Sequence, residues 1–492
     1  MNILLVYPKY PDTFWGFKTI LNLISKKTMY PPLGLLTVAS MLPKEWNKKL
    51  IDENIRDLKD EDIMWADMVF ISAMLVQKES SQEIINKCKG KNKVVVAGGP
   101  AFTMQHEKFD NVDHFVLNEA EVTLPLFLKD LKKGCAKKIY TSDIKPDITN
   151  TPIPSWNLIN FKDYGTMSLQ YSRGCPFNCE FCDIIVMNGR VPRTKTPKQF
   201  LSEVESLYNA GWRGGLFIVD DNFIGNKVEV KKMLRSLIEW QKVHKYPFTL
   251  LTEASTNLAD DEELMNLMIT ANFNKVFLGI ETPKIKSLKE CGKFQNVKRD
   301  LVESVKIIHK HGMQVMGGFI VGFDNDTKDI FKSQIDFIRE SSVVNAMVGL
   351  LTVIPQTRLW YRLKAEGRLV NDWTGENTDG VINFIPKLGK ESLLKGYKKI
   401  LSTIYSPIEY YKRIEQFIKE YNPTSKARIS LNNILTLIKS NWYIGVLSSD
   451  RWLYWKLLTK TFFTKIKAFP VAVELAICRL HFEKITNKVL SS

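Results

Sequence analysis

Three cysteines lie within eight residues of one another, at Cys175, Cys179 and Cys182. Iron–sulfur clusters are ordinarily bound by four Cys thiolates, so three thiolates at this spacing can hold three irons of a cubane cluster and leave the fourth without a protein ligand. A metal site with an open coordination position is a site where a substrate or cofactor binds. The spacing therefore predicts a reactive [4Fe–4S] cluster.

A zinc site is the alternative for these cysteines. Zinc would need a fourth ligand nearby, and no His or Cys lies between Cys182 and His244. Free cysteine otherwise behaves as a small hydrophobic residue. The remaining cysteines are scattered and are expected to be core or surface thiols: Cys88, Cys135, Cys291 and Cys478.

Residues 171–182, with Phe181 just before the last cysteine, resemble the signature of radical S-adenosylmethionine (SAM) enzymes. The resemblance implies that SAM binds the open iron through its amino and carboxylate groups, and that one electron from the cluster cleaves it to a 5′-deoxyadenosyl radical. It also implies an external reductant of the flavodoxin or ferredoxin type. Arg173 either supports the cluster loop or is a surface arginine.

The first 140 residues alternate short apolar runs with helical stretches. The runs cover residues 2–7, 68–72, 93–100 and 114–117. This is the βαβ pattern of an open parallel sheet, which binds ligands at the carboxyl ends of its strands. Ser72 ends one run, and Gly98, Gly99 and Pro100 end another. We therefore predict a Rossmann-like domain over residues 1–140.

A second strand–helix series follows a proline-containing linker at residues 141–165. Its six apolar runs cover residues 166–171, 215–220, 248–254, 275–281, 314–322 and 346–352. Six units match the partial (β/α)6 barrel that the radical SAM resemblance implies, here over residues 166–386, with the chemistry at the carboxyl ends of the strands. Residues 387–492 read as a helical C-terminal domain. The predicted fold class is α/β.

Polar residues follow several of the barrel strands. SAM needs acceptors for its ammonium group and ribose hydroxyls, and in radical SAM enzymes such positions bind the amino group and the adenosyl portion. The resemblance implies SAM-binding roles for Asp221, Glu253, Ser255 and Glu281. The alternative is that these side chains cap helices at the strand–helix junctions. No residue is assigned a catalytic role.

A Rossmann-like domain upstream of the barrel resembles the cobalamin-binding radical SAM proteins. Residues 30–36, 98–100 and 118–121 stand where that family has Pro-Pro-Leu-Gly, Gly-Gly and Gly-Glu-x-Glu elements, with Asn118 in place of the last motif's glycine. The family's Asp-x-His-x-x-Gly motif is absent, so the cobalt is expected without an imidazole ligand. The resemblance implies cobalamin binding by Pro32, Leu33, Gly34, Ser72, Gly98, Gly99, Pro100, Glu119 and Glu121.

Residues 7–15, 219–227 and 377–380 further resemble the hopanoid C-2 methylase branch. The resemblance implies a cobalamin-dependent radical SAM methylase that acts on an unactivated carbon of a membrane-associated, isoprenoid-like lipid. Cyclisation or carbon–carbon coupling is one alternative, and a non-catalytic cobalamin or redox sensor is another. A transfer-RNA methylthiotransferase would need three more cysteines in the N-terminal domain, and only Cys88 and Cys135 precede Cys175.

The formal net charge is +16, and residues 387–492 contribute +12 of it, from 19 Lys and Arg less 7 Asp and Glu. Basic residues mixed with aromatics suit an anionic membrane or nucleic acid, or form a packed helical cap. We expect the membrane, with shallow insertion of residues 468–473, and no nucleic-acid partner. The aromatic residues are Trp442, Tyr443, Trp452, Tyr454, Trp455, Phe462 and Phe463.

No run of 18 apolar residues occurs, so no spanning helix is predicted. An oxygen-labile cluster and unpaired cysteines indicate a reducing compartment. The expected location is the cytoplasm, with peripheral attachment to the inner face of the cell membrane.

Overall fold

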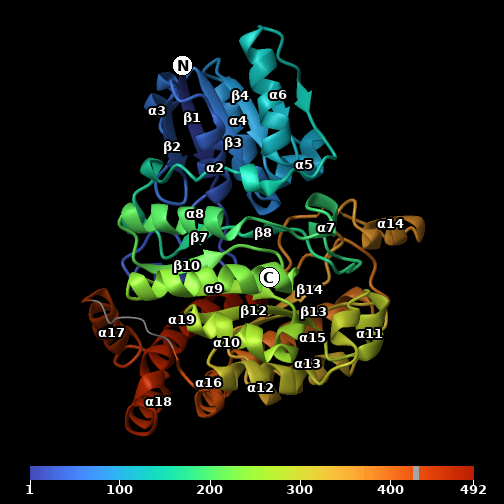
Figure 1. Ribbon diagram of the computed structural model, residues 1–492. Helices are drawn as coiled ribbons and strands as arrows, with labels where there is room; N and C mark the ends of the chain where they lie inside the picture. Colours follow the sequence, from blue (N-terminus) through green and yellow to red (C-terminus); the bar gives the residue numbers. More distant parts are fainter. Residues whose placement is uncertain (372, 425–430, 492) are drawn as a thin grey trace.

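Two parallel six-stranded sheets stand one above the other in the computed structural model of Figure 1, which describes residues 1–371, 373–424 and 431–491. The blue N-terminal sheet lies above the green-to-orange second sheet, and red C-terminal helices flank the second sheet. The predicted α/β fold class, with a helical C-terminus, is confirmed.

The N-terminal sheet has the strand order β2-β1-β3-β4-β5-β6. The order reverses direction between β1 and β3, and open α/β sheets bind ligands at such a point. Its strands are β1 (Asn2–Tyr7), β2 (Asn47–Asp52), β3 (Met68–Ser72), β4 (Val94–Gly98), β5 (His114–Val116) and β6 (Ile139–Tyr140). The four predicted strands are confirmed, and β2 and β6 add one at each edge.

Helices cover both faces of the N-terminal sheet and enclose a separate core on each. One face is covered by α2 (Leu33–Met41) and α6 (Ala120–Lys132). The other is covered by α3 (Asp60–Trp65), α4 (Lys78–Lys89) and α5 (Pro100–Gln105). Because both faces are covered, the central strands are buried throughout, as in β1, where Ile3, Leu4, Leu5 and Val6 are fully buried.

The second sheet has the order β14-β13-β12-β11-β10-β7, with every pair parallel. All six predicted strands are confirmed: β7 (Met167–Leu169), β10 (Gly214–Ile218), β11 (Phe248–Ala254), β12 (Phe273–Glu281), β13 (Gln314–Val321) and β14 (Ala346–Leu350). The helices between these strands are α8 (Pro197–Asn209), α9 (Lys227–Val243), α10 (Glu262–Thr270), α11 (Ile285–Glu290), α12 (Leu301–His311) and α13 (Ile330–Glu340).

Side chains along the second sheet alternate between two environments. In β11, residues 248, 250, 252 and 254 are buried, whereas residues 249, 251 and 253 are half-buried on the opposite face. Aromatic residues from the segment between β1 and α2 lie against this second face. The Trp15 ring is 5.0 Å from the Phe277 ring, and the Tyr30 ring is 5.5 Å from the Phe217 ring. The N-terminal part of the chain therefore contributes to the lining of the second sheet.

A short antiparallel hairpin, β8 (Ser172–Arg173) with β9 (Arg193–Thr194), follows β7. The segment between its strands carries the three cysteines and α7 (Ile184–Met187). We call residues 174–192 the cluster loop. The hairpin was not predicted, because strands of two residues are too short to give a periodic signal.

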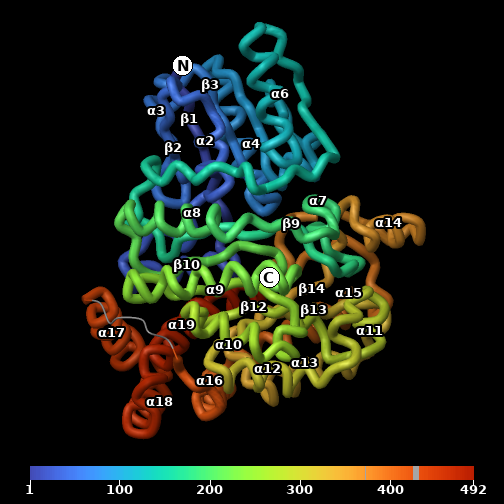
Figure 2. Tube along the Cα trace, viewed as in Figure 1, coloured from blue at the N-terminus to red at the C-terminus, as the bar shows by residue number. Residues whose placement is uncertain are grey.

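In the described part of the chain, six further α-helices lie after the second sheet: α14 (Arg358–Ala365), α15 (Lys390–Ile404), α16 (Pro407–Glu420), α17 (Leu431–Tyr443), α18 (Arg451–Thr464) and α19 (Phe469–Ser491). α19 packs against α1 (Lys18–Leu21), where the Phe14 and Phe482 rings stack at 4.7 Å and His481 Nε2 donates to the Phe14 carbonyl oxygen at 2.9 Å. α17 and α18 project from the side of the molecule (Figure 2). None of the described helices is long and apolar enough to cross a bilayer.

The prediction of shallow membrane insertion by residues 468–473 is wrong for three of them. Ala468, Ala472 and Val473 are buried in the core that α19 forms with α16 and α18. The aromatics of the neighbouring helices behave differently. Of the seven aromatics named above, Tyr454 is buried, whereas the other six are exposed and fill no core.

Candidate active site

The cluster loop begins with a glycine whose backbone lies in the left-handed region, at the point where the two ends of the loop come together. Gly174 has a φ of 97°, and a Cβ there would stand 3.0 Å from the carbonyl oxygens of Gly189 and Val191. The next residue, Cys175, donates its N–H to the Gly189 carbonyl oxygen at 3.2 Å. Glycine is therefore required at position 174 because the returning chain passes too close for a side chain.

Asp220, directly after β10, anchors the strand that leads into the loop. Its carboxylate accepts hydrogen bonds from the backbone N–H groups of Tyr171 and Ser172 at 2.7 and 2.8 Å, and from Ser172 Oγ at 2.7 Å. Asp220 is buried. The sequence placed Asp220 at a strand end but did not assign it this role.

Amide side chains point at two of the three cysteine sulfurs. Asn222 Nδ2 lies 3.6 Å from Cys175 Sγ, and Gln295 Nε2 lies 3.8 Å from Cys179 Sγ. Hydrogen bonds to cluster sulfurs are one means by which a protein tunes an iron–sulfur cluster. Neither amide was predicted as a site residue, because neither belongs to the cysteine motif.

The environment of the cluster cysteines is compatible with what bound iron requires of its thiol ligands. Burial is the main cause that raises the pKa of Cys179 and of Cys182. Bound iron overcomes this cost because a coordinating thiol is deprotonated by the metal. Among the described residues, no three His, Cys, Asp or Glu side chains converge closely enough to hold a single metal ion. A cubane cluster does not need such convergence, since each thiolate binds a different iron.

The remaining cysteines are as predicted. Cys88, Cys291 and Cys478 are buried, and Cys135 is exposed.

Three of the predicted SAM-binding residues lie near one another, and two of them contact Asn188 of the cluster loop or Asn222. The Asp221 carboxylate accepts from Asn188 Nδ2, on the cluster loop, at 3.1 Å. Ser255 Oγ lies 3.4 Å from Oδ1 of Asn222, the residue that contacts Cys175. Burial, then the charges of Asp221 and Asp220, raises the pKa of Glu253 to about 8. These side chains form one polar group at the carboxyl ends of β10 and β11.

Glu281, the fourth, pairs with a buried lysine. Its carboxylate accepts from Lys293 Nζ, and both side chains are largely buried. A Cβ on Gly279 would lie 2.5 Å from Lys293 Nζ, so the glycine leaves room for this pair. The charges of both partners act on the Cys179 thiol, which places the pair beside the cluster cysteines. Lys293 was not predicted.

A cavity of about 540 Å³ lies at the carboxyl ends of β1, β3 and β4. Its lining includes all nine residues predicted to bind cobalamin: Pro32, Leu33, Gly34, Ser72, Gly98, Gly99, Pro100, Glu119 and Glu121. Gln170, Arg173 and Asn188, which stand before and within the cluster loop, line the same cavity. No histidine is among its lining residues in the described part of the chain.

Two glycines shape the floor of this cavity. Gly99 has a φ of 91°, and a Cβ there would lie 2.5 Å from Ser72 Oγ. A Cβ on Gly98 would lie 2.6 Å from the Val116 carbonyl oxygen. Side chains at these positions would clash with the neighbouring strand ends, so glycine is required at both.

Four buried charges join the N-terminal sheet to the cluster hairpin. Glu119 accepts from Arg173 Nη1 and from Arg193 Nη2, both at 2.7 Å, and Glu121 accepts from Arg173 Nη2 at 2.8 Å. The side chains are 7 to 15% exposed. Arg173 is therefore a buried support of the cluster hairpin, and the surface-arginine alternative is wrong.

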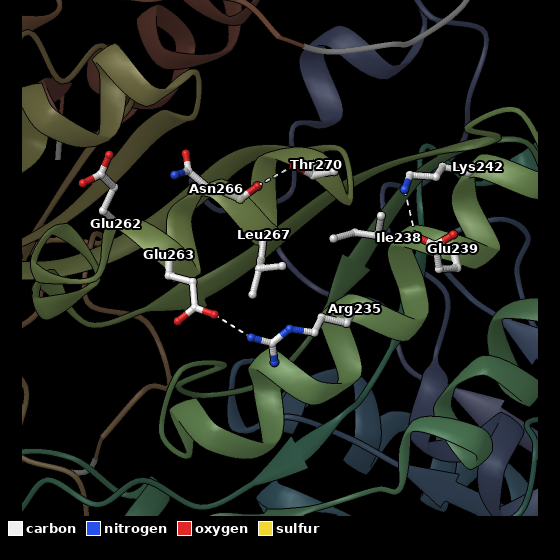
Figure 3. A pocket seen from close by; sticks show the side chains of 9 residues that line it. All are labelled: Arg235, Ile238, Glu239, Lys242, Glu262, Glu263, Asn266, Leu267 and Thr270. Atoms are coloured by element: carbon white, nitrogen blue, oxygen red, sulfur yellow. Dashed lines mark hydrogen bonds and ion pairs between the residues drawn. The ribbon is translucent and has the colours of Figure 1, made fainter.

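A second depression lies elsewhere, on the outer surface between α9 and α10 (Figure 3). Ion pairs cross or border it, including Arg235 with Glu263. It contains none of the predicted site residues, and we assign it no role.

Comparison with known proteins agrees with this geometry. The Radical SAM superfamily profile matches residues 169–338, and a Domain of unknown function (DUF4070) matches residues 357–492. An uncharacterized methyltransferase of Synechocystis is 43% identical, covering 92% of this chain and 86% of its own. The hopanoid C-2 methylase of Rhodopseudomonas palustris is 34% identical, covering 92% and 88%.

The fold also has a solved counterpart. The cobalamin-dependent SAM radical enzyme OxsB, with aqua-cobalamin bound, superposes with a TM-score of 0.63 at 15% identity, covering all of this chain and 80% of OxsB. The chain is thus a radical SAM enzyme. Within that superfamily it belongs to the family that contains the hopanoid C-2 methylase.

Proposed function

We propose that this enzyme transfers a methyl group to an unactivated carbon of a membrane-associated, isoprenoid-like lipid. Residues 1–140 would hold cobalamin, residues 166–386 the cluster and SAM, and residues 387–492 would meet the membrane. The observation that carries the proposal is the shared cavity. Residues from the ends of β3 and β4 line it together with Arg173 and Asn188 of the cluster hairpin and loop.

The arrangement suits transfer between two cofactors. When bound, the cluster and SAM supply a carbon-centred radical and cobalamin supplies the methyl group. The chain's contribution is to hold both at one water-poor interface, because a substrate radical must meet its methyl donor before side reactions occur. Arg173, fixed by Glu119 and Glu121, holds the two sites at a constant separation.

The second sheet offers an apolar surface to the substrate. Phe217, Phe277, Trp15 and Tyr30 lie on or against its half-buried face. Glu253 lies on the same face, where burial and then the charges of Asp221 and Asp220 raise its pKa to about 8. An aromatic lining with few charges favours a rigid hydrocarbon over a polar metabolite.

We expect cells that carry the gene to contain a lipid that cells without it lack. This lipid should be one methylene unit heavier than a lipid that both kinds of cell contain. A gene encoding Cys179→Ala is the matched control, since it preserves the protein and removes the cluster. Mass spectrometry of total lipid extracts measures the difference. A species lighter by two hydrogens would favour cyclisation or carbon–carbon coupling, and unchanged lipids would contradict a lipid substrate.

Exposed apolar side chains support contact with a membrane. They concentrate on α17, α18 and their flanks, where Leu431, Trp452 and Phe463 are 80, 77 and 83% exposed. On α17 the exposed positions recur at helical spacing and form one stripe: Leu431, Ile434, Leu435, Ile438 and Trp442. Tryptophan and tyrosine favour the membrane interface.

Charge supports the same contact. Residues 431–470 contain six Lys and Arg and a single acidic residue, Asp450, which is buried and paired with Arg479. Each basic residue near an anionic bilayer contributes about 1 kcal/mol, and full burial of a large apolar side chain contributes about 1.5–3 kcal/mol. We propose that this face rests on the anionic inner surface of the cell membrane.

We expect the full chain to sediment with phosphatidylglycerol vesicles at low salt. Replacing Ile438, Trp442, Trp452 and Phe463 together by serine should weaken binding at least about tenfold, because each loses its apolar contact. A matched variant with Val228, Val243, Ile285 and Ile408 replaced by serine alters equally exposed residues elsewhere. Equal binding by both variants, or no binding by the unaltered chain, would contradict the membrane contact.

A further inference from the structure

The segment that contains the second cluster cysteine is held from outside its own loop. Glu180, which follows that cysteine directly, donates its N–H to the Cys291 carbonyl oxygen at 2.7 Å and accepts from the Leu359 N–H at 2.9 Å. Arg358 Nη1 donates to the Asn178 carbonyl oxygen at 3.2 Å. Arg358 and Leu359 form the first turn of α14, so this helix contacts the cluster loop with its N-terminus.

The Glu180 side chain is bound by α14 as well. Arg362 donates from Nε to one carboxylate oxygen at 2.7 Å and from Nη2 to the other at 3.1 Å. A bidentate pair fixes orientation as well as charge. Every polar group of Glu180 is thus satisfied by residues outside the loop, and the residue is buried.

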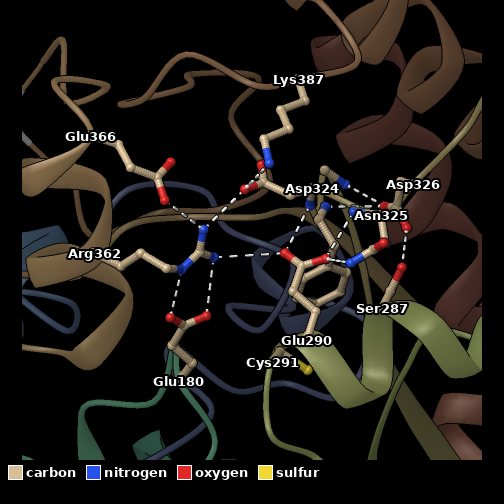
Figure 4. Close-up of polar contacts among 12 residues, drawn as sticks. Glu180, Ser287, Glu290, Cys291, Asp324, Asn325, Asp326, Arg362, Glu366 and Lys387 are labelled. Carbon is tan, nitrogen blue, oxygen red and sulfur yellow. Dashed lines mark hydrogen bonds and ion pairs between the residues drawn. The ribbon is translucent and has the colours of Figure 1, made fainter.

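Arg362 has three further acidic neighbours, which are Asp324, Glu290 and, on its own helix, Glu366 (Figure 4). Its Nη1 donates to Asp324 at 2.9 Å, and its Nη2 lies 3.7 Å from Glu290. Glu290 in turn accepts from the backbone N–H groups of Asp324 and Asn325 at 2.9 and 2.8 Å. One guanidinium therefore joins the cluster loop, the segment after β13 and the end of α11.

We propose that Arg362 is a positioning residue for the iron–sulfur cluster: by clamping Glu180 it sets the place of the Cys179 sulfur. The proposal rests on the cluster and is independent of the substrate. It gives the region matched by DUF4070, which begins at residue 357, a role at the cluster itself. Without the guanidinium, Glu180 and Glu290 would lose their arginine partner whereas Asp324 would keep Arg368, and the loop would lose its restraint on that side.

The test compares two variants. Arg362→Met keeps a long side chain without the positive charge, and Arg362→Lys keeps the positive charge without the two parallel N–H donors of the guanidinium. We expect Arg362→Met to lower reductive SAM cleavage by about 10–100-fold, the usual effect of losing a partner that orients a metal ligand. The electron paramagnetic resonance spectrum of the reduced cluster should change. In the iron-free protein, amide exchange within residues 175–183 should become faster. Arg362→Lys should give intermediate values.

Arg235→Met is the matched control, because it breaks an Arg–Glu pair on the outer surface (Figure 3), remote from the cysteines. All three measurements should be unchanged in it. If Arg362→Met does not fold, Glu180→Gln decides, because it leaves Arg362 bound to Asp324 and Glu290. An unchanged spectrum and unchanged exchange in the variant that folds would overturn the proposal, as would equal effects in Arg235→Met.

Discussion

Replacing any one of Cys175, Cys179 and Cys182 by alanine is expected to abolish reductive cleavage of SAM. Each thiolate would bind a different iron, and the loop contains no other Cys and no His. The loss should exceed the roughly 10–100-fold that removal of an outer partner costs a metal site. Iron content, the visible absorption of the reconstituted protein and the yield of 5′-deoxyadenosine measure the effect together.

Cys291→Ala is the appropriate control for this series. Cys291 is buried close to the loop, and its carbonyl oxygen accepts from Glu180 N–H, a bond that alanine preserves. The variant should therefore keep its cluster and its SAM cleavage. Retention of cleavage in a variant with all three cluster cysteines replaced would refute the assignment.

Replacing Glu119 by glutamine is expected to lower the free energy of unfolding by about 3–5 kcal/mol, the usual cost of removing one partner of a buried ion pair. The change leaves Arg193 without its carboxylate and takes one of two carboxylates from Arg173. Because these arginines belong to the cluster hairpin, the protein should also retain less cobalamin and less iron. Urea denaturation and cofactor content after gel filtration are the measurements.

A surface pair provides the comparison. Glu229 forms an ion pair with Lys232 on α9, and both side chains are substantially exposed. Glu229→Gln should change the free energy of unfolding by no more than about 1 kcal/mol, because exposed pairs contribute little. Equally small shifts for Glu119→Gln and Glu229→Gln would show that the buried charges do not hold the hairpin to the N-terminal sheet.

The sequence was most informative where a strand is buried on both faces. Continuous apolar runs identified β1, β3 and β4, because covered parallel strands exclude polar residues. The six strands of the second sheet were identified from apolar runs that admit some polar residues on the half-buried face, as in β11. β2 was missed because it lies at an edge and reads Asn47–Asp52, with two adjacent lysines and few apolar residues. Edge strands tolerate charge, so hydropathy does not reveal them.

The site could be predicted only as far as its contiguous motifs extend. The cysteines and the glycines at the end of β4 stand in recognisable runs. Arg173 and Glu119 are 54 residues apart, and Arg362 and Glu180 are 182 apart. Abundant residue types paired over such separations leave no local pattern, and their partners emerge only when the fold brings the elements together.

The packing of α19 against α1 bears on how the protein is made on the ribosome. Phe14 stacks on Phe482, and Lys439 reaches Ser25 on the other side of the same segment. Residues 14–25 are synthesised long before these partners, because 414 residues separate Ser25 from Lys439. The segment must therefore remain without its final contacts while both intervening sheets are synthesised.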